Sequence, residues 1–346
     1  MQCKVKQQSE IDAGRWNEFV RANSMGWAYF LYEMIGVDRY ASYRNLSFAI
    51  VDEDNADEIL FIMQLHRTNK YGILTKLPFW KEKLISRWGY VIKDGLVKKH
   101  QRRVKECFEE YIDNYIANNP IKRFSIDLAP ITRDRMENRD GINPLVFYNF
   151  KPQIRYTWVV DLSKPDDRML ADCEETTRQA IRKLEASDRY EFIEAQSTQE
   201  DCQTYINLHK ETYTRTGAAK DIIADEYHHN IFFNLMPKGI SRVFFLKEKE
   251  SGEIVATVAV LIYNKSAYYW WGDSKNEKEI GVNKYLLFKV ICLIRESFGK
   301  TGYFETGGAY PFLRKGKYKG LNDFKKCFGT FLMPIFAGEY VKIKRH

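Results

Sequence analysis

The sequence lacks most of the patterns that mark covalent and metal-dependent enzymes. Its six cysteines lie far apart, with no Cys-x-x-Cys pair and no histidine at ligand spacing, so neither a disulfide framework nor a metal site is predicted. It has no Gly-x-Ser-x-Gly motif and no Walker-type phosphate loop. No apolar run approaches the roughly 20 residues that cross a bilayer. These absences favour a cytoplasmic protein without a metal or cofactor, whose contact with a membrane is at most peripheral.

Aromatic residues and positive charge are what the chain has in quantity. Its 346 residues include 22 Tyr, 22 Phe and 7 Trp, enough apolar surface to fill two cores. The formal net charge is +8, spread among 46 acidic residues, so the surface is predicted to carry basic patches. Such patches favour anionic partners, among them nucleic acid, nucleotides and anionic lipid headgroups.

One order of elements occurs twice along the chain: hairpin, strand, helix, strand. In the first half these are expected at 46–51, 59–65, near 71–77, 104–116 and 124–128. In the second half they are expected at 243–247, 254–263, 267–271, 283–298 and 303–305. The sequence therefore predicts a duplicated α/β (α+β) module, with domains at residues 1–150 and 151–346 and a ligand cleft between them.

A strand at 156–162 is expected to begin the second domain. It runs into Ser163-Lys-Pro-Asp166, a predicted capping box for one helix that continues to Leu184 with its apolar residues on one face. Arg178 lies on the exposed side of this helix. A solvated face is one interpretation of that arginine, and a phosphate contact is the other.

The richest segment is Gly302-Tyr-Phe-Glu-Thr-Gly-Gly308, followed by a lysine-rich stretch. It predicts a short strand that ends at Glu305 and opens into a basic loop, where Gly307 and Gly308 let backbone amides approach phosphate oxygens. Lys315 and Lys317 would add positive charge to that loop. Glu305 is a candidate proton acceptor, although its carboxylate would equally suit an ion pair.

A second basic element follows, in which Phe324 and Phe328 bracket Lys325. An ammonium held there would suit direct acyl transfer, because an amine that attacks an activated ester needs positioning and positive charge near the oxyanion rather than an enzyme nucleophile. A surface lysine on a half-buried turn is the alternative. Upstream, Trp270 ends a strand and would either pack a core or stack a base.

Several ordered motifs resemble the FemABX-like peptidyltransferase family, a branch of the GNAT acyltransferase superfamily. They are Tyr268-Tyr-Trp-Trp-Gly-Asp, Tyr285-Leu-Leu, Gly302-Tyr-Phe-Glu-Thr-Gly-Gly and Phe324-Lys-Lys-Cys-Phe-Gly, preceded by Tyr156-Thr-Trp-Val-Val-Asp-Leu-Ser, Thr177-Arg-Gln-Ala-Ile-Arg and Thr212-Tyr-Thr-Arg-Thr-Gly. The similarity covers residues 150–340, and the order of the motifs carries it.

The resemblance implies two GNAT-like domains and transfer of an amino acid from aminoacyl-tRNA to an amine of a phosphorylated cell-wall precursor, the stem peptide of peptidoglycan. It assigns Phe324 and Lys325 to the catalytic centre. It also makes Arg215, Asp273 and Tyr285 candidates for substrate binding.

Two other functions stay open. An acyl-CoA donor, with an amino sugar or a lipid-linked precursor of a surface polysaccharide as acceptor, is disfavoured because the connection 272–281 offers few glycines for a pyrophosphate loop. A binding protein that has lost catalysis is disfavoured by the presence of Phe324, Lys325 and the two glycines.

Overall fold

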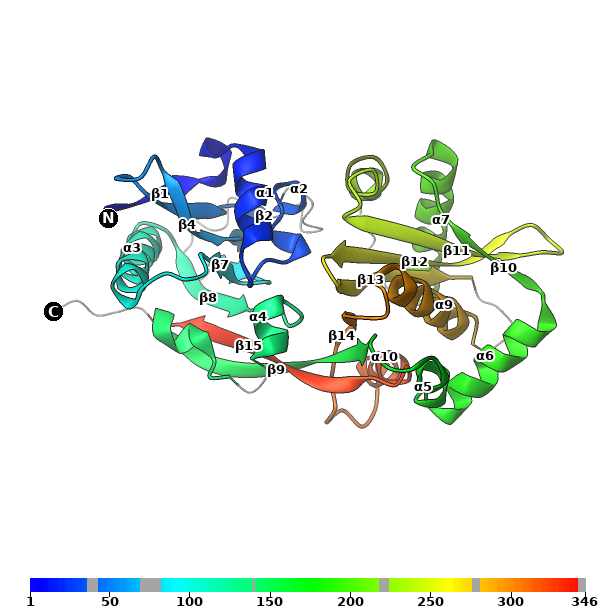
Figure 1. The fold of residues 1–346 in the computed structure, drawn as a ribbon. Helices are drawn as coiled ribbons and strands as arrows, with labels where there is room; N and C mark the ends of the chain where they lie inside the picture. The colour runs from blue at the N-terminus through cyan, green and yellow to red at the C-terminus, as the bar shows by residue number, and fades with distance from the viewer. Residues whose placement is uncertain (36–42, 69–81, 139–140, 218–223, 276–280, 342–346) are drawn as a thin grey trace. The chain divides into compact units, whose positions relative to one another are not determined.

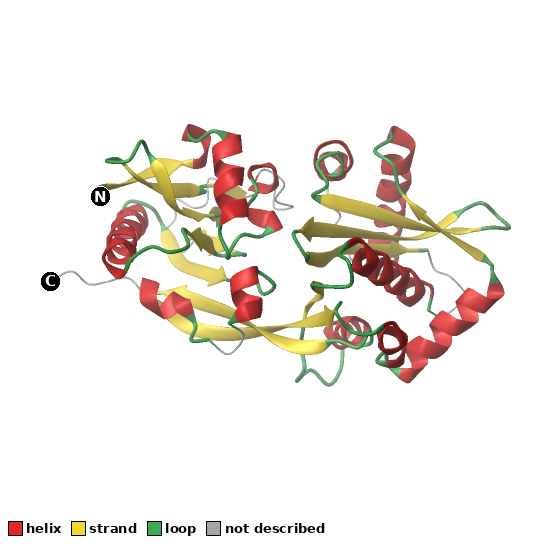
Figure 2. Cartoon of the chain, viewed as in Figure 1, coloured by secondary structure: helices red, strands yellow, loops and turns green. Residues whose placement is uncertain are grey.

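The computed structural model describes residues 1–35, 43–68, 82–138, 141–217, 224–275 and 281–341. These residues divide into two compact units. Unit 1 comprises residues 1–155 and 334–346, and unit 2 comprises residues 156–333. Figure 2 shows that each unit is built from both strands and helices. The chain passes between the units within two strands, β9 (Phe150–Asp161) and β15 (Phe331–Tyr340).

Unit 1 contains an antiparallel four-stranded sheet in the order β1-β3-β4-β7, and further strands in the order β15-β8-β6-β5-β2. Its remaining elements are β1 (Cys3–Gln7), α1 (Ala13–Ala22), α2 (Tyr32–Ile35), β2 (Tyr43–Asn45), β3 (Phe48–Asp52), β4 (Glu58–Met63), β5 (His66–Thr68), β6 (Glu82–Ser86), β7 (Tyr90–Ile92), α3 (Lys98–Ala117), β8 (Ile121–Asp127) and α4 (Arg133–Glu137). Helix α3 buries Val104, Phe108 and Ile112, which recur at helical spacing and pack on the sheet.

Unit 2 is a sheet in the order β10-β11-β12-β13-β14-β9 with helices against it (Figure 1). All neighbouring strands are antiparallel except β13 and β14, which are parallel. The remaining elements are α5 (Asp166–Ala171), α6 (Glu175–Ser187), β10 (Tyr190–Glu194), α7 (Gln199–Arg215), α8 (Asp225–Asn230), β11 (Ser241–Glu248), β12 (Ile254–Tyr263), β13 (Ser266–Ser274), α9 (Val282–Ser297), β14 (Tyr303–Gly308) and α10 (Lys317–Lys326).

The two faces of this sheet differ in polarity. Val258, Val260 and Phe304 point to one face and form an apolar core with α9 and α6. Because side chains alternate along a strand, Thr257, Asp273 and Glu305 belong to the opposite face. Helix α7 packs on β12 and β13. Thr257, Asp273 and Glu305 therefore share one side of the sheet of unit 2.

Most predicted elements of unit 2 are confirmed, since β12 and α9 lie within a residue or so of the expected bounds. The expected strand near 71–77 lies outside the described residues. Two local predictions were wrong. Gly307 and Gly308 do not open a loop, because both pair with β9 and extend β14 beyond Glu305.

The single helix predicted up to Leu184 is also wrong, because the chain forms α5 and α6 with a break between them. A contact with a distant segment stabilises this break, because the amide of Glu174, just before α6, donates to the carbonyl of Cys327 at 3.0 Å. Ser163 does not cap α5. Its hydroxyl and amide donate to Asp161 instead, and the residue that precedes the helix is Pro165.

Candidate active site

The parallel strands β13 and β14 pair over only three residues each. Ser266–Tyr268 pair with Tyr303–Glu305, and no later residues of the two strands pair with each other within the described chain. Beyond this point β14 bulges and follows β9, so that Gly307 lies opposite Trp158. Glu305 is therefore the residue at which the central strands of unit 2 separate.

The Glu305 carboxyl group is 2% exposed and has one described hydrogen bond. The Thr157 hydroxyl donates to its Oε1 at 2.7 Å, and its Oε2 is buried with no hydrogen-bond partner among the described residues. Burial raises the pKa of Glu305 to about 7, while the Thr157 hydrogen bond and the charge of Lys325 act in the opposite direction. A carboxyl group with a pKa near neutrality is suited to accept a proton in catalysis.

The ammonium group of Lys325 lies against the backbone of β14 at Gly307. A Cβ atom on Gly307 would be 2.8 Å from Nζ and 3.3 Å from Cε of Lys325, and the glycine has a φ of +104°. A side chain at this position would therefore displace the lysine, and its backbone conformation would be strained. The sequence thus brings together three of its predicted site residues: Glu305, Gly307 and Lys325.

Side-chain hydrogen bonds fix α10 against β14, which carries Glu305, and against β9. The Thr306 hydroxyl donates to the carbonyl of Lys325 at 2.8 Å. The Asn322 Oδ1 atom accepts from the indole nitrogen of Trp158 at 2.9 Å and from the amide of Tyr310 at 2.8 Å. These contacts hold α10 at Asn322 and at the carbonyl of Lys325, one turn apart, and so set the position of Lys325. Phe324 contributes from the apolar side, where its ring contacts Phe328 edge to face at 5.6 Å.

A second polar cluster lies beneath α7 on the same face of the sheet. His209 Nδ1 and Asp273 Oδ2 are 3.2 Å apart, and the two side chains are at most 1% exposed. The rings of His209 and His228 are 4.6 Å apart at their centroids. His209 Nε2, both ring nitrogens of His228, Asp273 Oδ1 and the hydroxyls of Tyr205 and Thr257 have no hydrogen-bond partner in the described chain.

Burial lowers the pKa of His228 to about 3, so its ring stays neutral at physiological pH. The arrangement ties α7 to β13 by a buried polar contact. Within the described part of the chain, no three His, Cys, Asp or Glu side chains form a group that would hold a metal ion.

Other predicted residues make contacts of their own. Arg215 donates to the carbonyl of Ser274 at 2.8 Å and leaves the rest of an exposed side chain in solvent. Trp270 is buried, is the extra residue of a bulge in β13, and packs edge to face against Tyr227. Tyr285 is buried on α9.

The remaining predicted residues are basic side chains and a glycine. Arg178 donates to the carbonyl of Ala171 at 2.8 Å and to that of Cys173, and therefore closes the turn between α5 and α6. Gly308 is the last residue of β14, with open space where a Cβ would lie. Lys315 is exposed, and the side chain of Lys317 lies outside the described part.

The structure also adds residues that motif reading missed, chiefly Thr157, Asn322 and His209. Thr157 and Glu305 are 148 positions apart in the chain, and His209 and Asp273 are 64 apart. Nothing local in the sequence signals such pairs. A buried threonine on the strand antiparallel to Glu305 could have been found only once the strand order was known.

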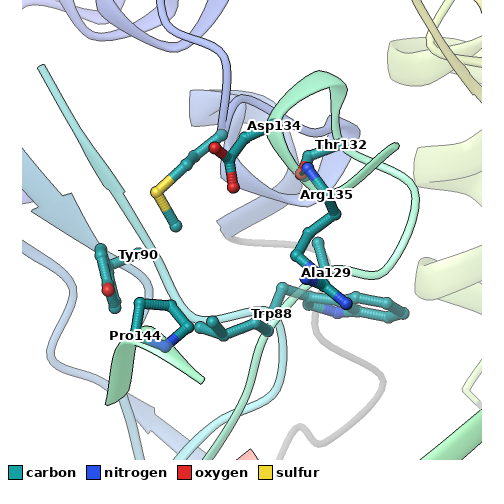
Figure 3. A pocket seen from close by; sticks show the side chains of 9 residues that line it. Trp88, Tyr90, Ala129, Thr132, Asp134, Arg135 and Pro144 are labelled. Carbon is teal, nitrogen blue, oxygen red and sulfur yellow. Dashed lines mark hydrogen bonds between the residues drawn. The ribbon is translucent and has the colours of Figure 1, made fainter. Parts of the chain in front are cut away.

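Unit 1 has a small pocket, shown in Figure 3, whose lining includes Trp88, Asp134 and Arg135. The Arg135 guanidinium lies 3.8 Å from the centroid of the Phe336 ring and donates to the carbonyl of Asn138 at 3.0 Å. Trp88 stacks on Tyr29 at 4.3 Å. Because its arginine is held by these contacts, we assign this pocket to the packing of unit 1.

The described helices include none with the length and apolar content that spanning a bilayer requires. No curated protein sequence matches the chain. Residues 171–314 match the protein family described as an acetyltransferase (GNAT) domain.

Solved structures resemble the whole chain. FemX aligns with a TM-score of 0.69 at 16% identity, covering 96% of both chains. A domain assigned as the C-terminal part of a lysylphosphatidylglycerol synthetase from Agrobacterium fabrum aligns with a TM-score of 0.60 at 14% identity, covering 96% of this chain and 93% of the other. A tandem GNAT protein of the clavulanic acid pathway aligns with a TM-score of 0.54 at 8% identity, covering 98% of both. The chain therefore has a tandem GNAT fold, and its residues 171–314 match the acetyltransferase (GNAT) domain.

Proposed function

We propose that the protein is an N-acyltransferase that moves an aminoacyl group from aminoacyl-tRNA to an amine of a peptidoglycan precursor. One observation carries the proposal: the buried carboxyl group of Glu305, with a pKa near 7, lies where the central strands separate and within range of the charge of Lys325. The FemX fold supports it at the level of architecture. Such a reaction belongs in the cytoplasm, at the inner face of the membrane where envelope precursors are made.

The two groups suit the two needs of direct transfer. The acceptor nitrogen forms a bond to the ester carbonyl carbon, and the carbonyl electrons move onto oxygen, where the charge of Lys325 stabilises them. The ionised Glu305 accepts the proton released by the attacking amine. When the intermediate collapses, the ester C–O bond breaks, and the leaving ribose oxygen takes up the proton that Glu305 had accepted, which leaves a hydroxyl.

Arg215, Arg178, Lys315 and Lys317 are proposed to contact phosphate groups of the donor or acceptor. Of these four residues, Arg215 is the best suited to bind a phosphate group, because it is exposed and its one described hydrogen bond leaves further N–H donors available. Asp273 is buried against His209 and would act on substrate only through the position of β13. Tyr285 and Trp270 are buried too, so their contribution to binding would be to the shape of the site.

The test is incubation of the full chain with charged tRNA and a purified pool of peptidoglycan precursors, followed by intact mass measurement of the pool. The proposal expects an added mass equal to one amino acid residue. Precursor that binds tightly but gains no mass with any charged tRNA or acyl-CoA would contradict it and would favour a binding protein without catalysis.

The alternative is an acyl-CoA donor with an amino sugar or lipid-linked precursor as acceptor. The match of residues 171–314 to an acetyltransferase domain favours it. Calorimetric titration with acetyl-CoA and, separately, with aminoacyl-tRNA distinguishes the two donors, because the proposal expects micromolar binding of the tRNA only.

A further inference from the structure

The segment between β14 and α10 places apolar side chains in solvent, where a globular domain usually buries them. Phe312 is 85% exposed and Tyr318 is 59% exposed, with Tyr310, Leu313 and Leu321 each more than 40% exposed. Single exposed apolar residues are common on protein surfaces, but five within twelve positions are not. Figure 1 shows the segment as a loop that leaves the end of β14 and returns into α10.

The same segment is basic. Arg314 and Lys315 are exposed at the tip beside Phe312 and Leu313. Residues 306–322 contain no acidic side chain. The cations on α10 that follow are partly neutralised, because Lys319 pairs with Asp323 and Lys326 with Glu174, whereas no described ion pair involves Arg314 or Lys315. An exposed apolar tip between cations is complementary to an anionic surface with an apolar interior.

The loop is also tied to the catalytic helix. The Leu313 amide donates to the carbonyl of Tyr310 at 3.1 Å, which forms a turn with Phe312 at its tip. The rings of Tyr310 and Tyr318 are 5.4 Å apart and join the two ends of the loop. Asn322 accepts from the Tyr310 amide at the base, two residues before Phe324 and three before Lys325. The loop therefore has a defined shape next to the candidate site.

We propose that residues 310–321 dock unit 2 onto the surface of a membrane rich in anionic phospholipid, with Phe312 and Leu313 among the acyl chains and Arg314 and Lys315 at the headgroups. This inference rests on the proposed function and deepens it by naming an anionic bilayer surface as the partner of this loop. A nucleic acid partner fits less well, because Phe312 and Leu313 occupy the tip, where leucine has no stacking face for a base.

The experiment is sedimentation of the full chain with vesicles of phosphatidylglycerol and phosphatidylcholine in equal parts, and with vesicles of phosphatidylcholine alone. We expect binding to the anionic vesicles that weakens as salt rises. Phe312→Ser should weaken this binding by about tenfold, from the loss of one buried aromatic side chain. Lys315→Glu should weaken it by about tenfold through the reversal of one charge near the headgroups.

Matched controls lie in unit 1. Ile142, which is 89% exposed, supplies Ile142→Ser, and the exposed Lys122 supplies Lys122→Glu; both should bind vesicles as the wild type does. The vesicle experiment contains no acyl donor, so it does not depend on acyl transfer. Vesicle binding can therefore fail while transfer succeeds, and transfer can fail while vesicle binding succeeds. Equal binding to both vesicle types, or equal weakening by the unit 1 variants, would overturn the proposal. Loss of tRNA binding with unchanged vesicle binding in Phe312→Ser would overturn it in favour of a nucleic acid surface.

Discussion

The Nζ atom of Lys325 lies 2.8 Å from the position that a Cβ atom would take on Gly307. The lysine thus occupies the space that the glycine leaves free. This relationship explains why a glycine is needed near the end of a paired strand, although glycine ordinarily weakens a strand. It also makes the position of the ammonium group sensitive to a single methyl group.

Gly307→Ala is therefore expected to reduce the rate of acyl transfer by about tenfold or more, since a displaced ammonium no longer faces the developing oxyanion. It should also destabilise unit 2 by about 1–2 kcal/mol, because alanine is strained at positive φ. The matched control is Gly308→Ala, whose Cβ would meet nothing within 4 Å. Transfer rates and urea unfolding of both variants check the prediction, and equal behaviour of the two would remove the Gly307 contact from the mechanism.

Lys325→Met should lower turnover by about 10²-fold, which is typical of the loss of one group that stabilises an oxyanion. Methionine keeps most of the length and apolar character of the side chain, so the helix should pack as before. Lys326→Met is the control, because Lys326 is exposed and contacts Glu174 at 3.4 Å on another side of α10. Steady-state rates measure the effect. Wild-type turnover in Lys325→Met would exclude the ammonium from catalysis.

The local half of this site was predictable from the sequence. Glu305, Gly307, Phe324 and Lys325 lie in two short motifs of distinctive composition, and motif order was enough to indicate the GNAT fold. Strands and helices with strong periodicity, such as α9, were also found, because a single apolar face determines them.

The other half depends on contacts between distant segments. The break between α5 and α6 is set by the Cys327 carbonyl, more than 150 positions away from Glu174, and no helix signal in the segment itself records it. In the same way, β9 extends β14 through Gly307 and Gly308, which local turn propensity assigned to a loop. The return of β15 from residue 334 onward to unit 1 is likewise a tertiary event without a local pattern.

The pH dependence of transfer should report Glu305. If its ionised form accepts the proton, kcat/KM should rise with pH and level off above about 7. Thr157→Val removes the hydrogen bond that lowers this pKa, so the rise should move to higher pH, whereas Thr157→Ser should leave it in place. Rate profiles from pH 5 to 9, roughly the range over which such a group titrates, measure the shift. If Thr157→Val does not shift the pH at which kcat/KM rises, the rise reports the titration of a group other than Glu305.

Glu305 should also make the folding stability depend on pH. Its pKa is raised in the folded state, from 4.5 to about 7, so the folded protein holds this proton over a range in which the unfolded chain has lost it. Stability is therefore expected to fall as pH rises from about 4.5 to about 7, by on the order of 3 kcal/mol. Glu305→Gln removes this dependence. Urea unfolding of both proteins at pH 5 and pH 8 should show that the stability of the variant relative to wild type increases with pH, and a constant difference would contradict the assignment.

The buried contact between His209 and Asp273 provides a last prediction, about stability rather than chemistry. His209→Leu leaves the Asp273 carboxyl group, which is 1% exposed, without its described partner, and this should destabilise the protein by about 1–3 kcal/mol. Asp273→Asn keeps the shape and a hydrogen-bonding group, so its effect should be smaller, about 1 kcal/mol. The double variant His209→Leu with Asp273→Leu should recover part of the loss of the first, because neither polar partner is then left buried alone. Urea unfolding of the three variants measures these differences. A double variant less stable than His209→Leu would show that the pair stabilises α7 on β13 through more than the avoidance of an unpaired buried polar group.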